Sequence, residues 1–234
     1  MNRPASHLIV ALDTSSLREA VRLARQLQDL VRYVKIGSVL FTAEGPRAIR
    51  QLRALGFEVF LDLKFHAIPS TVEKSCRAAV VHQPCMLTVH AGGGDAMLKA
   101  AVVGAHEEAA RRRIAPPRVV AVTVLTSDGA ATSAHQIARR VDTLAAHAKA
   151  AGCDGVVASV REAAAIRRRI RRPFLLVCPG IRAPGEATGD QVRVASPHEA
   201  IRAGADFLVV GRPVTQARHP REAARQLIHQ MRSR

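Results

Sequence analysis

The sequence of 234 residues predicts an α/β protein with the fold of a (β/α)8 barrel, the TIM barrel. Apolar runs of four to eight residues, expected to be buried strands, alternate eight times with longer segments of helical periodicity. Eight strand–helix units in roughly this length are typical of a closed barrel. A doubly wound sheet is the alternative, but the first run ends in residues 11–16 without the glycine-rich turn that such a sheet carries.

Four strands are expected in the first half of the chain, at residues 7–13, 32–37, 57–62 and 85–90. They are rich in branched and aromatic residues that favour strands, and Gly56 marks the turn before the third. The segment after the first strand has apolar residues at spacings of three and four, namely Leu17, Ala20, Val21, Ala24 and Leu27. This spacing gives a helix one apolar face that can cover a sheet.

The second half repeats the pattern at residues 118–125, 154–158, 173–177 and 206–210. Gly152 and Gly204 precede the sixth and eighth strands and mark the turns that lead into them. No linker or low-complexity segment separates these units, so we expect residues 1–234 to form a single domain. One longer polar segment, near residues 180–195, interrupts the alternation after the seventh strand.

The formal net charge of +16 raises nucleic-acid binding as a hypothesis. Most basic residues are arginines spread over the expected helices, with clusters at residues 111–113 and 167–172. The chain has one Tyr, no Trp and six Phe, so the aromatic platforms on which single-stranded nucleic acids stack are scarce. We therefore expect no dedicated nucleic-acid partner, but a positive surface that attracts an anionic substrate.

The chain contains no uninterrupted apolar run of about 18 residues, so no membrane-spanning segment is expected. Residues 1–7 lead into the first strand without the apolar segment of a signal peptide. Cys76, Cys85, Cys153 and Cys178 are scattered and form no Cys-x-x-Cys pair. We expect them to be small buried residues in a reducing compartment, which makes the cytoplasm the expected location.

Charged residues gather where the expected strands end. Asp62 and Lys64 lie two positions apart, so a regular strand would project both side chains from one face. Asp13 ends the first strand, and Lys35 lies within the second, where a buried cation is unfavourable unless an anion meets it. Separately, Asp62 and Lys64 could be a surface ion pair, and either Asp13 or residues 14–16 could cap a helix. Together, the two Asp and two Lys predict an alternating set of charges at the barrel mouth.

Residues 62–71 read Asp-Leu-Lys-Phe-His-Ala-Ile-Pro-Ser-Thr, and a helix is expected to begin at Pro69 or Ser70. The string resembles the Asp-x-Lys-x-x-Asp-Ile-Pro-x-Thr signature of orotidine 5′-phosphate decarboxylases, which convert orotidylate to UMP in de novo pyrimidine biosynthesis. Ala67 stands where that signature has its second Asp. Further strings resemble the family in order and spacing at residues 88–93, 122–127, 178–182, 190–193 and 208–215.

The resemblance implies a decarboxylation without cofactor or metal, in which the protein supplies electrostatic stabilisation and binding energy. It implies that Lys64, Asp62 and Lys35 are catalytic. Asp62 would lie beside the departing carboxylate, and Lys64 would stabilise and protonate the ring carbon. Lys35 would orient these two groups.

The resemblance also implies a set of contacts to a nucleotide substrate. The implied substrate-binding residues are Asp13, Lys35, Ile68, Thr71, Thr126, Pro179, Arg182, Gln191, Gly211 and Arg212. Thr126 would hold the pyrimidine edge, and the segment near residues 180–195 would close over the 5′-phosphate. Ile68 and Thr71 would reach into the site of a neighbouring subunit, so a homodimer with shared sites is implied.

Ala67 bears directly on the expected activity. An alanine can neither orient Lys64 nor add negative charge, so we expect turnover of orotidylate to be strongly impaired, whether the substitution is engineered or natural. One alternative is a metal-assisted sugar-phosphate decarboxylase or synthase of the same barrel group, which lacks the Ile-Pro-x-Thr continuation of residues 68–71. A catalytically silent nucleotide-binding protein is another.

Overall fold

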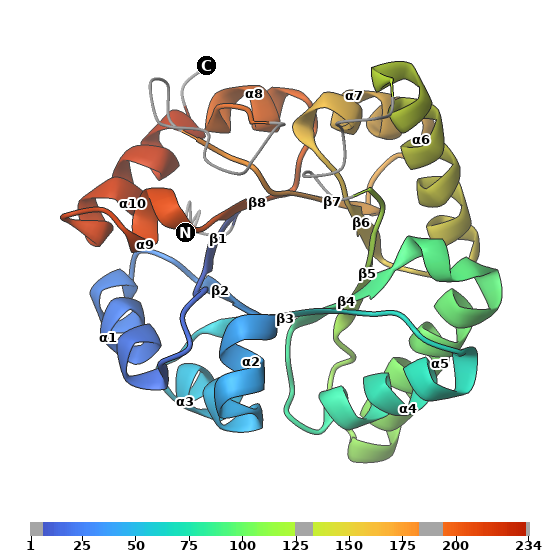
Figure 1. The fold of residues 1–234 in the computed structure, drawn as a ribbon, viewed down its shortest axis with the longest axis horizontal. Helices are drawn as coiled ribbons and strands as arrows, with labels where there is room; N and C mark the ends of the chain where they lie inside the picture. The colour runs from blue at the N-terminus through green and yellow to red at the C-terminus, as the bar shows by residue number, and fades with distance from the viewer. Residues whose placement is uncertain (1–6, 125–132, 183–193, 233–234) are drawn as a thin grey trace.

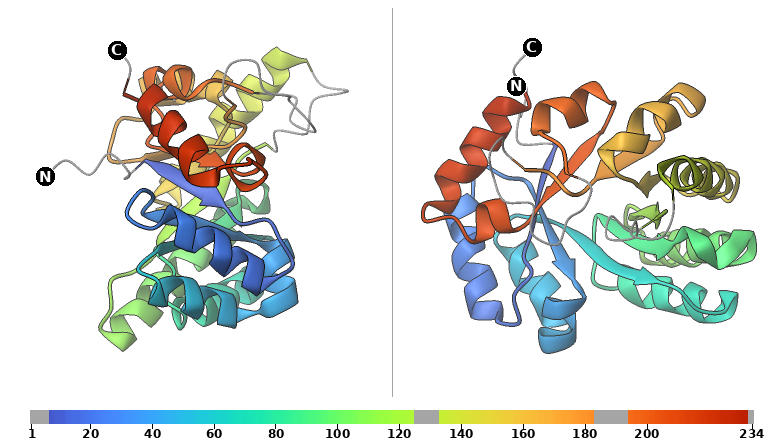
Figure 2. Two further views of the ribbon diagram at one scale, coloured as in Figure 1. Left: turned by 90° about the vertical axis from the view of Figure 1, so that its left-hand side faces the viewer. Right: turned by 45° about the horizontal axis from the view of Figure 1, so that its top comes forward.

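The computed structural model describes residues 7–124, 133–182 and 194–232. Its strands form a closed parallel barrel in chain order, because each strand pairs with the next and β1 (Leu8–Ala11) pairs with β8 (Phe207–Val210). Helices surround this barrel on the outside (Figure 1), and the two further views in Figure 2 show the same enclosure. The predicted TIM barrel is therefore confirmed.

The strands lie where the sequence predicted them. The six between β1 and β8 are β2 (Tyr33–Gly37), β3 (Glu58–Phe65), β4 (Met86–His90), β5 (Arg118–Val122), β6 (Gly155–Val157) and β7 (Leu175–Cys178). Two strands end clearly earlier than predicted, since β1 ends at Ala11 and not at residue 13, and β5 ends at Val122 and not at residue 125. Two others extend further than predicted at their carboxyl ends. β7 continues to Cys178, and β3 continues through the charged residues to Phe65.

The described helices are α1 (Leu17–Leu27), α2 (Ser38–Glu44), α3 (Pro46–Ala54), α4 (Pro69–Val80), the 3-10 helix η2 (Ala91–Gly93), α5 (Gly94–Arg112), α6 (Ala134–Ala150), α7 (Val160–Arg169), α8 (Pro197–Arg202), α9 (Arg212–Thr215) and α10 (Pro220–Gln230). Ser16, and not Asp13, caps α1, because its side chain accepts a hydrogen bond from the Glu19 amide at 3.3 Å. Pro69 begins α4, as predicted. Over the described segments, no helix is long and apolar enough to cross a bilayer.

Apolar layers pack against both faces of the barrel wall. Alternate strand residues, among them Ile9, Phe60 and Met86, form a cluster to which no helix contributes, so it fills the barrel interior. The intervening residues, such as Leu8 and Val10, pack with the inner faces of the helices in a larger cluster. The barrel is therefore a packed core, and ligands are expected at the strand ends, as in other TIM barrels.

Gly155 allows β6 and β7 to approach closely. A methyl group added at its Cα would lie 2.6 Å from Leu175 Cβ and would also overlap the carbonyl oxygen of Leu175. The Gly155→Ala variant must therefore move the two strands apart. We expect it to lower the free energy of unfolding by about 1–3 kcal/mol, measured by urea denaturation. Unchanged stability would contradict this tight packing.

Candidate active site

Four charged side chains form a network at the barrel mouth, where the carboxyl ends of the strands meet. Asp13 follows β1, Lys35 lies in β2, and Asp62 and Lys64 lie in β3. Lys35 Nζ is 3.2 Å from Asp13 Oδ1 and 3.4 Å from Asp62 Oδ2. Lys64 Nζ is 3.0 Å from the same Asp62 oxygen. These contacts make up the alternating set of charges expected from the sequence, and we call the four residues the ion-pair network.

The centre of the ion-pair network is buried and its two ends are accessible. Lys35 is 8% exposed and Asp62 is 9% exposed, whereas the side chain of Lys64 is 39% exposed and Asp13 is exposed. A ligand at the mouth would therefore meet the ammonium group of Lys64 and the carboxylate of Asp13. Beneath them, Lys35 and Asp62 neutralise each other away from solvent.

Opposing influences act on the pKa of Asp62. Burial is the largest, and it raises this pKa because it disfavours the charged carboxylate. The positive charges of Lys35 and Lys64, together with hydrogen bonds from Lys64 and Thr88, outweigh burial and hold the pKa below its ordinary value. Asp62 is therefore ionised at neutral pH and provides a fixed negative charge at the mouth.

Gly37 at the end of β2 leaves room for the ion pair between Lys35 and Asp13. A Cβ atom at position 37 would lie 3.0 Å from Lys35 Nζ and 3.1 Å from Asp13 Oδ1. Such contacts are tighter than ordinary van der Waals contacts, so a side chain would displace one member of the pair. A residue without functional groups thus determines where the charges can meet.

Lys64 departs from the regular strand geometry on which the sequence argument rested. Its φ angle is +50°, in the left-handed region that non-glycine residues rarely adopt. The register between β3 and β4 also shifts between Leu61 and Phe65. The two side chains meet, as expected from the sequence, but the strand that carries them is not regular at Lys64. An irregular backbone brings the two charges together.

Thr88 of β4 supports this irregular backbone and was not predicted as a site residue. Its side-chain oxygen accepts a hydrogen bond from the Lys64 amide at 2.8 Å, and its hydroxyl donates to Asp62 Oδ1 at 2.9 Å. The residue is fully buried. One hydroxyl thus holds both the backbone of Lys64 and the carboxylate of Asp62. In the sequence, Thr88 could have been noticed as a polar residue in the middle of the mostly apolar run of residues 85–90.

The segment between β3 and the first turn of α4 is exposed. Ala67, Ile68 and Thr71 all have accessible side chains, and Ile68 is 68% exposed although it is apolar. Within the described residues, no hydrogen bond or ion pair of the ion-pair network involves these three. Next to them, the His66 ring stacks on the His90 ring, with centroids 5.0 Å apart and an interplanar angle of 17°.

The predicted binding residues near β7 differ in burial, and some lie outside the described residues. Pro179 directly follows the strand and is partly buried. Arg182 is buried, and its Nη1 donates to the carbonyl oxygen of Ile181 at 2.8 Å. Thr126 and Gln191 lie outside the described residues, as does most of the segment near 180–195.

The end of β8 adjoins the ion-pair network. A Cβ atom at Gly211 would lie 3.7 Å from Asp13 Oδ2, so this glycine lies beside the accessible end of the network. Arg212 follows as the first residue of α9 and is exposed. The end of β8 thus adds an arginine next in sequence to Gly211, and a mouth with groups of both signs suits a ligand with several charges.

Metal ligands and thiols are two other kinds of group that could act at the mouth, and the described residues give little support to either. Across residues 7–124, 133–182 and 194–232, no three His, Cys, Asp or Glu side chains are grouped so that they could hold a metal ion. All four cysteines are free, and burial raises the pKa of the Cys178 thiol to about 12. Cys178 is therefore protonated at neutral pH.

Comparisons with known proteins converge on one family. The model described as the orotidine 5′-phosphate decarboxylase / HUMPS family matches residues 6–227. The orotidine 5′-phosphate decarboxylase of Parasynechococcus marenigrum (strain WH8102) is 47% identical over 226 residues, which cover 94% of this chain and 92% of that protein. The enzyme of the same name from Anaeromyxobacter sp. (strain K) is 47% identical over 228 residues, with coverages of 95% and 97%.

A solved structure gives the same result. The crystal structure of orotidine 5′-phosphate decarboxylase from Lactobacillus acidophilus superposes with a TM-score of 0.84 at 34% identity. The match covers 97% of this chain and 100% of that chain. Both the sequence and the fold are therefore similar to this family over nearly their whole length.

The double role of Thr88 can be tested by stability measurements. Thr88→Val keeps the shape of the side chain but leaves the Lys64 amide without its acceptor and Asp62 with one donor fewer. We expect the free energy of unfolding at pH 7 to fall by about 1–3 kcal/mol in urea denaturation. Thr88→Ser retains a hydroxyl and should stay closer to the parent protein. Equal stability of the two variants would contradict the bridging role.

The lowered pKa of Asp62 predicts how stability depends on pH. A carboxyl group whose pKa is lower in the folded state stabilises the protein above the unfolded pKa of about 3.9, and this contribution is lost as the pH falls through the folded pKa. We therefore expect the free energy of unfolding to decrease below about pH 4, with a smaller decrease in Asp62→Asn. Asp29→Asn, which removes an exposed carboxylate, is the matched control. Identical acid-side slopes in parent and Asp62→Asn proteins would refute this assignment.

Proposed function

Because the chain belongs to the orotidine 5′-phosphate decarboxylase / HUMPS family, we propose that the ion-pair network is the catalytic centre of an orotidine 5′-phosphate decarboxylase. The protein is a carboxy-lyase of this type, acting on a small nucleotide substrate. The observation that carries the site assignment is the contact of Lys64 with the buried, ionised Asp62. An accessible ammonium group is held there next to a fixed carboxylate.

The proposed chemistry follows from these two charges. The bond between the pyrimidine ring and its carboxylate breaks, carbon dioxide leaves, and the electron pair stays on the ring carbon. Asp62 would lie beside the substrate carboxylate, so repulsion between like charges is relieved when carbon dioxide departs. The Lys64 ammonium group would stabilise the developing carbanion and transfer a proton to it, which completes UMP.

The other predicted residues would bind the nucleotide. Lys35 and Asp13 would orient the central charges and hold ribose hydroxyls. We assign the remaining nucleotide contacts to Thr126 at the pyrimidine edge and to Pro179, Arg182, Gln191, Gly211 and Arg212 around the phosphate. Binding energy from this remote phosphate can be used to close the site and to place the reacting carbon.

We expect the enzyme to act as a cytoplasmic homodimer with shared sites. By the family resemblance, Ile68 and Thr71 would reach into the site of the neighbouring subunit. The exposure of Ile68 supports this arrangement. Its apolar side chain is 68% exposed, and covering it with a second copy would stabilise the dimer. Residues 1–234 would form one domain, in which the segment near 180–195 closes over the phosphate.

Ala67 favours a second candidate function, a nucleotide-binding protein with little turnover. Position 67 lacks the carboxylate of the family signature, so Lys64 is expected to be less well oriented and the mouth less negative. A metal-assisted reaction on sugar phosphates is the less supported alternative, since the relatives at 47% identity are named orotidine 5′-phosphate decarboxylases.

The Ala67→Asp variant tests the function and the impairment together. Restoring the carboxylate should raise the single-turnover rate of decarboxylation of orotidine 5′-phosphate on the order of 100-fold, the size of a single preorganised electrostatic contact. Rapid-quench measurement of UMP formation provides the rate. Equal rates in the parent and in Ala67→Asp would contradict the proposed impairment.

Two controls complete this experiment. Ala54→Asp adds the same charge at an exposed position at the end of α3. This residue precedes the amino-terminal end of β3, at the end of the barrel opposite the mouth, so the rate should be unchanged. Lys64→Ala removes the proposed proton donor and should abolish UMP formation in both backgrounds. Turnover that survives in Lys64→Ala would refute the proposed role of this residue.

A further inference from the structure

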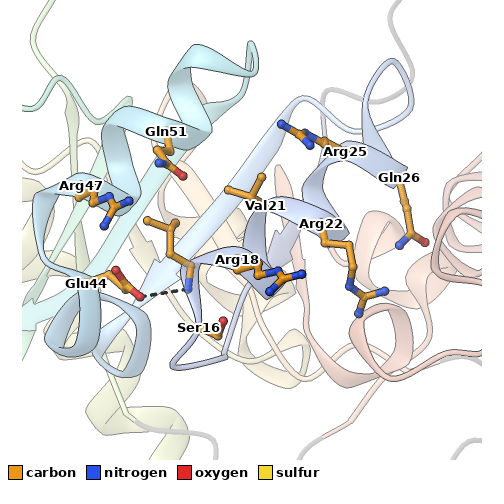
Figure 3. A pocket seen from close by; sticks show the side chains of 10 residues that line it. Ser16, Arg18, Val21, Arg22, Arg25, Gln26, Glu44, Arg47 and Gln51 are labelled. Carbon is orange, nitrogen blue, oxygen red and sulfur yellow. Dashed lines mark hydrogen bonds between the residues drawn. The ribbon is translucent and has the colours of Figure 1, made fainter.

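A groove on the outer wall of the barrel lies between α1 and the α2–α3 region. Its volume is about 800 Å³, and its lining residues are Ser16, Leu17, Arg18, Val21, Arg22, Arg25, Gln26, Glu44, Arg47 and Gln51. Figure 3 shows Arg18, Arg22 and Arg25 along α1, with Arg47 and Gln51 on α3 across from them. None of the four residues of the ion-pair network lines this groove. We call it the α1–α3 groove.

Four arginines make the α1–α3 groove positively charged. Arg18, Arg22 and Arg25 are spaced by four and three positions, so they follow one face of α1, and Arg47 adds a fourth guanidinium from α3. All four are exposed. Like charges four positions apart on a helix are mutually destabilising. A bound anion would therefore reduce the repulsion between these arginines.

These four guanidinium groups form no ion pair within the described part of the chain. None of them forms a hydrogen bond or ion pair there, whereas the half-buried Arg77 contacts both Glu73 and Glu107. Glu44, the one carboxylate among the lining residues, accepts a hydrogen bond from the Leu17 amide at 3.3 Å (Figure 3). The charge of the groove is thus available to an external ligand.

The groove also offers neutral contacts. Val21 lies between the two arginine-bearing helices (Figure 3), and Leu17, which also lines the groove, is buried. Ser16, Gln26 and Gln51 add groups that can donate or accept hydrogen bonds. A volume of about 800 Å³ falls within the range of small-molecule sites and exceeds what a single phosphate ion fills.

We propose that the α1–α3 groove binds linked phosphate groups, in a nucleoside polyphosphate or in inorganic polyphosphate. Guanidinium groups bind phosphate oxygens through paired hydrogen bonds, and four of them along one groove suit two or three linked phosphates better than one. The groove shares no lining residue with the ion-pair network, so this proposal does not depend on the function proposed for the mouth. A bound polyanion would link α1 to α3 and stabilise the folded protein.

Calorimetric titration with three probes tests the proposal: tripolyphosphate, a nucleoside triphosphate and orthophosphate. We expect tripolyphosphate and the nucleoside triphosphate to bind at least tenfold more tightly than orthophosphate at physiological ionic strength. Tighter binding of the nucleoside triphosphate than of tripolyphosphate would identify a nucleotide as the ligand, and equal binding would identify the phosphate chain alone.

Variants of the same net charge locate the site. Arg18→Gln combined with Arg47→Gln should weaken tripolyphosphate binding at least tenfold and leave UMP binding unchanged. The matched control combines Arg139→Gln with Arg140→Gln, which are exposed on α6, and should bind tripolyphosphate like the parent. Unfolding curves in the absence of ligand establish that both double variants are folded.

Three results would overturn the proposal. One is tripolyphosphate binding that persists in the groove variant, which would place the anion elsewhere on the protein. Another is an equal loss in the groove and control variants, which would reveal general attraction by the net charge. The third is binding of a short RNA duplex that is tighter than that of tripolyphosphate and lost in the groove variant, which would identify a nucleic-acid surface.

Discussion

The contact between Lys35 and Asp62, both buried beneath the barrel mouth, is the interaction on which the proposed site depends. Removing one partner of such a buried pair typically lowers stability by about 3–5 kcal/mol, because the other charge is left uncompensated. The parallel register of β2 and β3 sets their separation, since it pairs Lys35 with Phe60 and Gly37 with Asp62. The register of two strands thus determines the electrostatics of the mouth, and the small size of Gly37 leaves space for it.

The position of Lys64 answers two opposed requirements. Its ammonium group must contact Asp62 to be held in place, and it must also remain accessible to a ligand. The left-handed backbone at Lys64 and the local register shift meet both requirements, at the cost of an unfavourable φ angle. Thr88 offsets this cost, because its buried hydroxyl bonds the Lys64 amide and the Asp62 carboxylate together.

The large positive charge is distributed unevenly. Some arginines form ion pairs within the protein, whereas others in the described part of the chain are free to contact a ligand. Asp206, for example, gathers Arg167 and Arg172 near the amino-terminal end of β8, where these pairs tie neighbouring segments together. The 35 basic residues outnumber the 19 acidic ones, and several arginines of the described segments form no ion pair. The α1–α3 groove collects four of the remaining ones, whereas the mouth combines positive and negative groups. The two regions therefore suit different ligands.

The sequence by itself determined the barrel, the order of its strands and the identity of the charged residues at the mouth. These features depend on local patterns: strand-forming runs, helical spacing and the string of residues 62–71. Only the tertiary structure decided the extension of β3 to Phe65, the left-handed backbone of Lys64, the role of Thr88 and the α1–α3 groove. Each of these requires residues that are far apart in the chain, such as Lys64 and Thr88, to meet in space. A local sequence pattern cannot predict a contact between two strands, because the contact depends on both partners and on the register that brings them together.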